Sequence, residues 1–227
     1  MQIFKLDNPA WHSLNEAHKD FGIDYNGIKF YNPYYCSFGG ALNDENAESG
    51  IVRYASITNQ FFVIGDRLPI NHKVRLEGEL VCDQMILNQR INVDIMENII
   101  ELHTEAQRDQ LFKLVNLVQP GYFKEKTADL GNYYGIYKND QLVAATGERM
   151  KMDGYTELSA IVTHPDHTGK GYAKQLIAYA SKQIFNESKI PYLHVADNNA
   201  NAIRLYEKLG FLLRRKMSFW KLSSNEQ

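Results

Sequence analysis

Apolar residues recur at helical spacing in three stretches of the chain. In residues 104–118 they stand three and four positions apart, and Thr104 and Gln107 have the spacing of a capping box at the start. Residues 169–185 and 200–209 show the same periodicity. In the second stretch the positions on one face are Ala173, Leu176, Ile177, Ala180 and Ile184. We therefore predict helices over these three ranges.

Short segments rich in β-branched and aromatic residues lie between and around these helices and predict strands. They are residues 133–138, 141–150, 155–163, 192–196 and 211–221. Three strands, a helix, a strand, a helix and a strand in this order are typical of a mixed central sheet with helices on both faces. The predicted fold class is α+β, with an α/β-like alternation of helices and strands toward the end of the chain.

The first hundred residues follow a less regular pattern. Asn8 is a candidate N-cap and Pro9 a candidate first helical residue, so a helix is predicted to run from them toward Gly22. Extended segments are predicted at residues 28–34, 60–65 and 74–82, and a polar loop at residues 42–50. Because the chain is too long for one ordinary domain and too short for two full ones, we expect two unequal parts.

We place the boundary between these parts near residue 100. Residues 1–100 are expected to form a smaller α+β region of unknown role. Residues 101–227 are expected to form a complete domain, since all the strongly periodic helices lie there.

Composition narrows the class of protein. Apolar residues make up 44% of the chain, charged residues 23%, and the formal net charge is −2, with no block of one sign that would predict a surface for nucleic acid or anionic lipid. Cys36 and Cys82 stand far apart and lack metal-ligand spacing. No apolar run is long enough to predict a signal peptide or a membrane span. We expect a cytoplasmic protein without a metal ion, a nucleic-acid partner or a membrane partner.

A glycine-containing turn joins the strand at 155–163 to the helix that follows it. Gly169 and Gly171 would let the backbone approach an anion closely, and the free N–H groups of the helix start favour negative charge. Lys170 adds a nearby cation. The residue after Lys170 is Gly171, which excludes a Walker loop, and residue 174 is Lys, which excludes a Rossmann fingerprint. The turn is therefore a candidate phosphate site of another kind.

The segment TELSAIVTHPDHTGKGYAKQLI resembles the coenzyme A pyrophosphate motif of the GNAT superfamily of N-acetyltransferases. Gly169, Gly171 and Ala173 match the motif, while Thr168 stands where Arg or Gln is usual. The segment LHVADNNANAIRLYEKLGF is similar to the second cofactor motif of the same superfamily. There Asn199, Ala202 and Tyr206 match.

The resemblance covers roughly residues 120 to 222 and is closest to the glycine N-acyltransferase-like branch. A degenerate copy of the same fold is one interpretation of residues 1–100. The resemblance implies a GNAT fold and acetyl-CoA as cosubstrate. It also implies direct transfer of the acetyl group, within a ternary complex, to a primary amine of a small molecule or a peptide.

The resemblance also assigns residues to the cosubstrate. It implies that the strand ending at Thr163 splays from its neighbour, so that backbone amides of Ile161, Val162 and Thr163 bond the pantetheine arm and one of them polarises the carbonyl. It implies that the turn and the start of the helix bind the diphosphate, through Thr168, Gly169, Lys170, Gly171, Tyr172 and Ala173. Asn199 is expected to bond the pantetheine, to cap the helix at 200–209, or to do both.

Tyr206 is the candidate general acid, because its phenol could protonate the leaving thiolate and the family places a tyrosine there; packing beneath the helix is the alternative. Glu157 is a candidate general base and Glu148 its competitor, if burial raises the pKa of either carboxyl. A solvated strand face or an ion pair with Arg149 are the alternatives, and a water relay without any dedicated base is another.

Two further groups of residues are candidates for a site. Tyr122, Phe123, Tyr133 and Tyr134 are candidates for the acceptor site, although such a cluster is more often core. His164 and His167 are separated by two residues, but no third ligand with zinc spacing accompanies them. A coenzyme A sensor that has lost its chemistry is the competing function, favoured by Thr168. The acceptor and the choice between monomer and homodimer are not indicated by the sequence.

Overall fold

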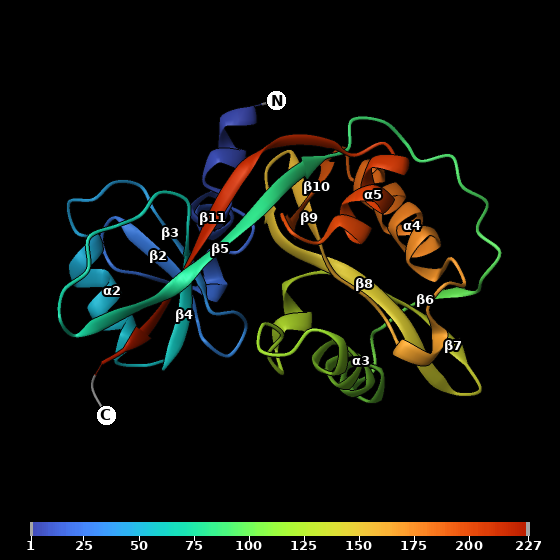
Figure 1. The fold of residues 1–227 in the computed structure, drawn as a ribbon, viewed down its shortest axis with the longest axis horizontal. Helices are drawn as coiled ribbons and strands as arrows, with labels where there is room; N and C mark the ends of the chain where they lie inside the picture. The colour runs from blue at the N-terminus through green and yellow to red at the C-terminus, as the bar shows by residue number, and fades with distance from the viewer. Residues whose placement is uncertain (1, 226–227) are drawn as a thin grey trace.

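Residues 2–225 are described by a computed structural model, and within them eleven strands form one mixed sheet (Figure 1). Its order is β1-β2-β3-β4-β11-β5-β10-β9-β8-β7-β6. The strands are β1 (Gly22–Asp24), β2 (Ile28–Tyr31), β3 (Phe38–Ala41), β4 (Gln60–Ile64), β5 (Val74–Ile86), β6 (Ile99–Glu101), β7 (Tyr133–Lys138), β8 (Gln141–Met152), β9 (Tyr155–Thr163), β10 (Ile190–Ala196) and β11 (Leu212–Ser224). Neighbours pair antiparallel except β3 with β4 and β9 with β10.

Two long strands, β5 and β11, cross the middle of the molecule and join its two lobes (Figure 1). They pair from Val74 with Ser224 to Ile86 with Leu212. The last residues of β5 also pair with β10, at Cys82 with Ala196 and onward. The sheet therefore runs through both of the predicted parts, and strands of the amino-terminal region border the carboxy-terminal one.

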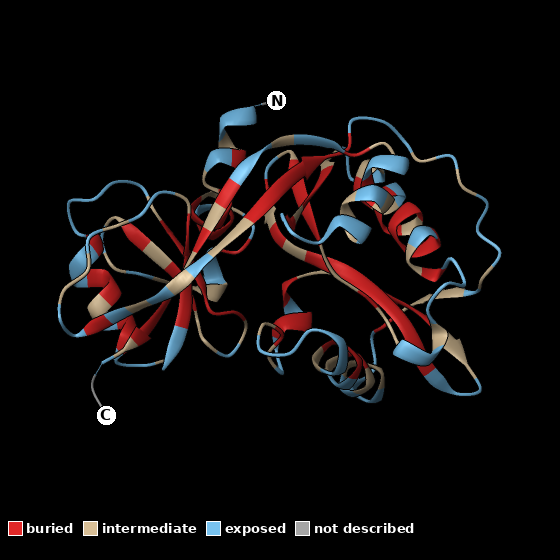
Figure 2. Cartoon of the chain, viewed as in Figure 1, coloured by how far each residue is buried: buried red, intermediate tan, exposed pale blue. Residues whose placement is uncertain are grey.

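Helices cover both faces of the sheet, as predicted. The helices are α1 (Pro9–Asn15), α2 (Ala47–Ala55), α3 (Glu105–Val118), α4 (Tyr172–Asn186) and α5 (Ala200–Lys208). In Figure 1, α3 lies below β8 while α4 and α5 lie above it, and the strands between them are almost wholly buried in Figure 2. The α+β prediction is confirmed. None of the helices within residues 2–225 is long and apolar enough to cross a membrane.

Local signals explain where the helices begin. The Thr104 side chain accepts from the N–H of Gln107, and the Gln107 side chain accepts from the N–H of Thr104, so the predicted capping box is present. Asn8 caps α1 as predicted, since its side chain accepts from the N–H of Trp11. That helix ends at Asn15, well before Gly22, and a separate 3-10 turn follows at Lys19–Phe21.

The predicted loop at residues 42–50 is wrong in its second half, because α2 begins at Ala47. Ala47, Ile51 and Tyr54 are fully buried and lie four and three residues apart, so a helical face is present in the sequence. Asp, Asn and Gly residues around its start have low helix propensity and favour the prediction of a loop. The short strands β1, β3 and β6 were not predicted either; each has only three or four residues.

A buried histidine joins the two lobes. His18 Nε2–H donates to the carbonyl of Leu130 (2.8 Å), and its Nδ1 lies 2.9 Å from the hydroxyl of Tyr31 and 3.1 Å from that of Ser13. Its exposed fraction is 2%. Burial lowers its pKa from 6.5 to about 4, against the raising effect of the Leu130 carbonyl. The neutral ring is therefore part of the folded state.

We expect acid to weaken the fold through this residue. A folded pKa below the unfolded value means that His18 contributes stability fully above pH 6.5 and loses it as the pH falls toward 4. The loss is about 3 kcal/mol of unfolding free energy. Urea unfolding of the wild type and of His18→Gln between pH 7 and pH 4 measures it, since Gln retains a donor for Leu130 but does not titrate. Equal pH slopes for both proteins would contradict the assignment.

Candidate active site

Strands β9 and β10 part in the middle of the sheet. They pair only from Tyr155 with Ile190 to Glu157 with Tyr192. Beyond Glu157, β9 continues to Thr163 beside β8, while β10 continues to Ala196 beside β5. Because successive N–H groups of a strand point to opposite sides, alternate amides of β9 past Glu157 face the opening.

A β-bulge reshapes β9 at the same level. Its pairing with β8 shifts between Ser159 and Val162, and Ala160 within the shift has φ +50°. That left-handed conformation is costly for alanine and is seen most often where function requires it. Bulges re-aim backbone groups beside active sites. The bulge lies next to Ile161 and Val162, two of the residues predicted to bond pantetheine.

The opening between the strands leads into a cavity of about 380 Å³. Its lining includes Leu158–Val162 from β9, Val195 and Ala196 from β10, and residues of α5. Val115 and Val118 from α3, the segment that follows α3, and strands of the amino-terminal lobe also contribute. Ile161 and Val162 thus lie on the cavity, whereas Thr163 does not.

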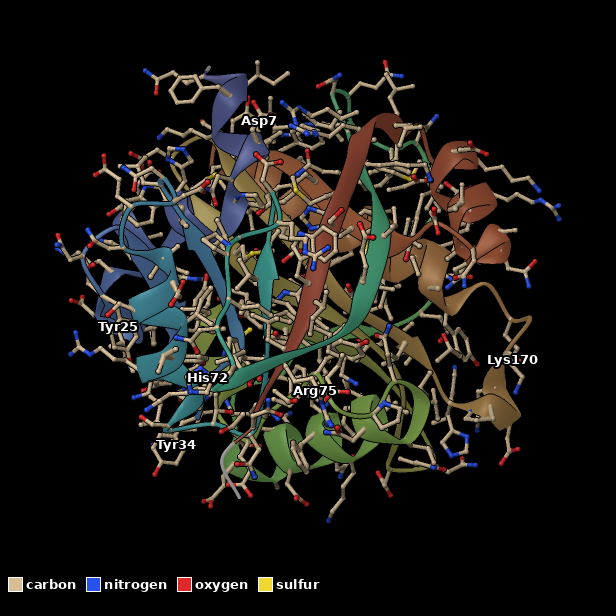
Figure 3. All side chains as sticks on the ribbon, turned by 60° about the vertical axis from the view of Figure 1, so that its left-hand side comes forward. Asp7, Tyr25, Tyr34, His72, Arg75 and Lys170 are labelled. Atoms are coloured by element: carbon tan, nitrogen blue, oxygen red, sulfur yellow. The ribbon has the colours of Figure 1, made fainter. Side chains whose placement is uncertain are left out.

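The predicted phosphate turn lies at the far end of β9. Gly169 has φ +76° and Gly171, the N-cap of α4, has φ +75°, and no side chain caps that helix start. A Cβ built on either glycine would meet no atom within 4 Å. The turn is therefore open to solvent, with helix N–H groups unused by side chains. Lys170 lies at the outer edge of the molecule in Figure 3.

The other residues of this turn have different surroundings. The hydroxyl of Thr168 donates to the carbonyl of Pro165 (3.2 Å), so it stabilises its own turn. Tyr172 is buried in the core cluster beneath α4 together with Leu176, so only its backbone faces the turn. Ala173 follows it in the first turn of the helix.

Alanine at Gly171 should weaken acetyl-CoA binding. The left-handed backbone there costs an L-residue about 1–2 kcal/mol, which corresponds to roughly tenfold in affinity when the turn must keep its shape. Gly78→Ala is the matched control, because Gly78 also has open space around it but no positive φ. Calorimetric titration of both variants compares them. Equal affinities would show that the turn does not bind the cosubstrate.

Tyr206 lines the cavity from α5 and is 7% exposed. Burial raises its pKa to about 12, so the phenol keeps its proton at neutral pH. Its ring packs against Phe211. Within residues 2–225 no group hydrogen-bonds its hydroxyl, which leaves that hydroxyl free for a ligand. Packing beneath the helix and a position on the cavity are therefore both observed.

Asn199 caps α5 and also lies on the cavity. Its Oδ1 accepts from the N–H of Ala202 (3.2 Å) and caps α5. Asn199 and Ala202 both line the cavity. Because the cap uses only the oxygen, the side-chain amide of Asn199 keeps its donors for a ligand.

Glu157 is fully buried and paired on two sides. Arg149 Nε donates to its Oε2 (2.8 Å) and Nη2 to its Oε1 (2.9 Å), while His194 Nδ1 lies 2.8 Å from Oε1. Burial alone would raise its pKa, but the charge and hydrogen bonds of Arg149 and the hydrogen bond of His194 outweigh it and lower the pKa to about 2. The expectation of a raised pKa is wrong for this residue, and the alternative of an ion pair with Arg149 is confirmed.

Glu148 is fully buried as well. Lys151 Nζ lies 2.7 Å from its Oε2, which also accepts from the N–H of Asn132 (3.2 Å). Its Oε1 has no partner within the described residues. Neither Glu148 nor Glu157 is among the residues that line the cavity.

Comparison with known proteins agrees with this arrangement. Residues 133–220 match the family model described as FR47-like protein. The crystal structure of a GNAT-family protein from Novosphingobium aromaticivorans superposes with a TM-score of 0.88 at 26% identity, covering 97% of this chain and 98% of that one. The chain therefore has the GNAT fold.

Two curated relatives share shorter stretches with this chain. The spermidine N(1)-acetyltransferase of Vibrio cholerae serotype O1 is 49% identical over 55 residues, which cover 23% of this chain and 31% of the relative. An uncharacterized N-acetyltransferase of Bacillus subtilis is 32% identical over 88 residues, or 38% of this chain and 35% of the relative. The chain thus matches about a third of the length of these relatives.

The aromatic candidates for the acceptor site of this chain divide into two pairs. Tyr122 and Phe123 line the cavity. Tyr133 is buried against Phe123 and does not line the cavity, and Tyr134 packs on Tyr179 of α4. His164 and His167 contact each other edge to face, and within residues 2–225 no three His, Cys, Asp or Glu side chains gather as metal ligands.

Several residues of the cavity were not predicted. Phe38, Leu80, Cys82 and Phe219 reach it from strands outside the two cofactor motifs, and their long-range pairing is invisible in local patterns. His194 was also missed as a partner of Glu157. A signal for it exists, because a titratable residue inside the apolar run at 192–196 needs a buried partner.

Proposed function

We propose that this GNAT chain transfers an acetyl group from acetyl-CoA to a primary amine of a small molecule or peptide, within one ternary complex. The parting of β9 from β10 carries the proposal, because it opens the sheet onto a cavity that also contains Tyr206. Acetyl-CoA, when bound, supplies the acetyl thioester.

The residues present fit that cosubstrate. Free amides of β9 beside Ile161 and Val162 would bond the pantetheine arm and one would polarise the carbonyl. The open cradle of Gly169 and Gly171 would receive the diphosphate, helped by the charge of Lys170. The side-chain amide of Asn199 would donate to the arm.

Tyr206 is the proposed proton donor. Its raised pKa keeps the proton on the phenol oxygen until a strongly basic thiolate forms beside it. For the amine, we propose that a water relay removes the proton, because the pKa of Glu157 near 2 makes it a weak base at neutral pH and Glu148 lies away from the cavity. Glu157 then acts by holding Arg149 and His194 in place.

The finer assignments stay predictions from the sequence. They are membership of the glycine N-acyltransferase-like branch, the division near residue 100, a cytoplasmic location, the absence of nucleic-acid and membrane partners, and a monomeric or homodimeric state. The relative from V. cholerae is named for spermidine, but the match covers 31% of that protein. Its acceptor is therefore not carried over to this chain.

Initial-rate kinetics with acetyl-CoA and a panel of amines test the proposal. Direct transfer within a ternary complex predicts intersecting double-reciprocal lines, whereas a covalent acetyl-enzyme gives parallel ones. The second candidate is a coenzyme A sensor, favoured by Thr168 in place of Arg or Gln. Acetyl-CoA binding without turnover of any amine, and without hydrolysis, would support that sensor.

A further inference from the structure

Within residues 2–225, the cavity lining carries one permanently charged side chain, and that charge is positive. Among the described residues that line it, no Asp or Glu is present, and Arg149 is the one side chain with a permanent charge. The other lining residues with polar side chains are Gln119, Tyr122, Thr127, Ser159, His194, Asn199 and Tyr206. A polycationic acceptor would find no free carboxylate on the described part of this lining, because the charge of Arg149 is already paired with that of Glu157.

The guanidinium of Arg149 keeps free donors on its outer edge. Its pair with Glu157 is side-on and uses Nε–H and one hydrogen of Nη2. Of the five N–H donors of an arginine, three therefore remain, two of them on Nη1. Within residues 2–225, Nη1 has no hydrogen-bond partner, and it is not among the buried atoms that lack one. The edge formed by Nη1 and Nη2 has the geometry that binds a carboxylate through two parallel hydrogen bonds.

The position of this edge is fixed by its surroundings. The guanidinium carbon lies 4.6 Å from the ring centroid of Phe38, which itself lines the cavity. The imidazole Nδ1 of His194 lies 2.8 Å from Oε1 of Glu157, the oxygen that also accepts from Arg149 Nη2. Gln84 Nε2 lies 3.1 Å from the Nε2 of His194. The carboxylate of Glu157 therefore cannot turn away from Arg149 without breaking a buried hydrogen bond.

Much of the remaining cavity lining is apolar or aromatic. Phe38, Leu80 and Phe219 come from the amino-terminal lobe and β11, and Tyr122 and Phe123 from the segment after α3. Rings of this size can cover an apolar body of several carbon atoms. An acceptor as small as glycine would leave this surface uncovered.

We propose that the acceptor is an amine that also carries a carboxylate and an apolar side chain, with the carboxylate bound by the free edge of Arg149. This substrate class rests on the proposed acetyl transfer. A larger α-amino acid carries all three groups on its α-carbon. Spermidine and simple alkylamines lack the carboxylate.

Matched pairs of acceptors test this inference. Phenylalanine is compared with 2-phenylethylamine and leucine with 3-methylbutylamine, and spermidine is the polycationic probe. A charge-assisted bidentate pair should favour each amino acid over its decarboxylated partner by about tenfold or more in kcat/KM. The ratio should fall in Arg149→Lys, which keeps the charge beside Glu157 but loses the planar fork.

The outcomes separate this inference from the proposed function. If amines are acetylated but spermidine or the decarboxylated partners are preferred, the inference fails and acetyl transfer stands. If nothing is acetylated, ligand-detected NMR with the CoA-saturated protein still compares each pair, and equal binding of acid and amine overturns the inference. Should Arg149→Lys fail to fold, the wild-type ratios decide the question.

Discussion

Tyr206→Phe is expected to lower kcat by about 10²- to 10⁴-fold, because it removes only the proton proposed for the leaving thiolate. The affinity for acetyl-CoA should change by less than about threefold, since the ring and its packing against Phe211 remain. Steady-state kinetics beside calorimetric titration separate the two quantities. Because the pKa of Tyr206 is about 12, ionisation of this phenol should not reduce wild-type activity at any pH below 10.

Tyr179→Phe is the control for this substitution. Tyr179 lies on α4 and packs on Tyr134, and it is not among the residues that line the cavity. Its loss of a hydroxyl should leave kcat unchanged. A Tyr206→Phe enzyme as active as this control would remove the tyrosine from the chemistry and favour a role in packing.

Arg149→Ala should lower the free energy of unfolding by about 3–5 kcal/mol, since it leaves the buried carboxylate of Glu157 without its main counter-charge. The Arg149 side chain is 14% exposed and that of Glu157 0%. The charge of Glu157 raises the pKa of Arg149 despite burial, so both groups are ionised in the folded protein. Urea unfolding at neutral pH measures the change.

Arg75→Ala is the matched control, because Arg75 pairs with Glu77 on the surface, where its side chain is 64% exposed (Figure 3). Exposed pairs contribute about 0–1 kcal/mol. Replacing Arg149 and Glu157 together by Leu should recover much of the stability, because both charges of this pair are then removed. Equal losses for Arg149→Ala and Arg75→Ala would contradict the buried ion pair.

Local patterns predicted the carboxy-terminal part of the fold well. The capping box at Thr104 and the apolar face of α4 depend on residues a few positions apart, and the structure places both elements within three residues of the predicted ends. The amino-terminal lobe was less predictable. There β3 has four residues, two of them glycines, and its place in the sheet depends on pairing with residues of β4 that stand 24 positions later, such as Phe38 with Phe62.

The site shows the same division. The turn at Gly169 and the helix of Tyr206 could be found from motif spacing, because each is a local strand-to-helix unit. The surroundings of Glu157 could not be predicted in full, since the register shift between Glu148 and Lys151 determines how Arg149 meets the carboxylate. The part of the cavity lining formed by Phe38 and Phe219 depends on the order of the strands in the sheet, which local patterns do not contain.

Titration calorimetry of the purified chain with acetyl-CoA tests most directly whether the opening beside β9 and the turn at Gly169 receive the cosubstrate. We predict one molecule bound per chain with a Kd below about 1 mM, in the usual range for enzyme substrates. We also predict that Gly171→Ala weakens this binding and Gly78→Ala does not. No measurable heat with either acetyl-CoA or free coenzyme A at millimolar concentration would contradict the account.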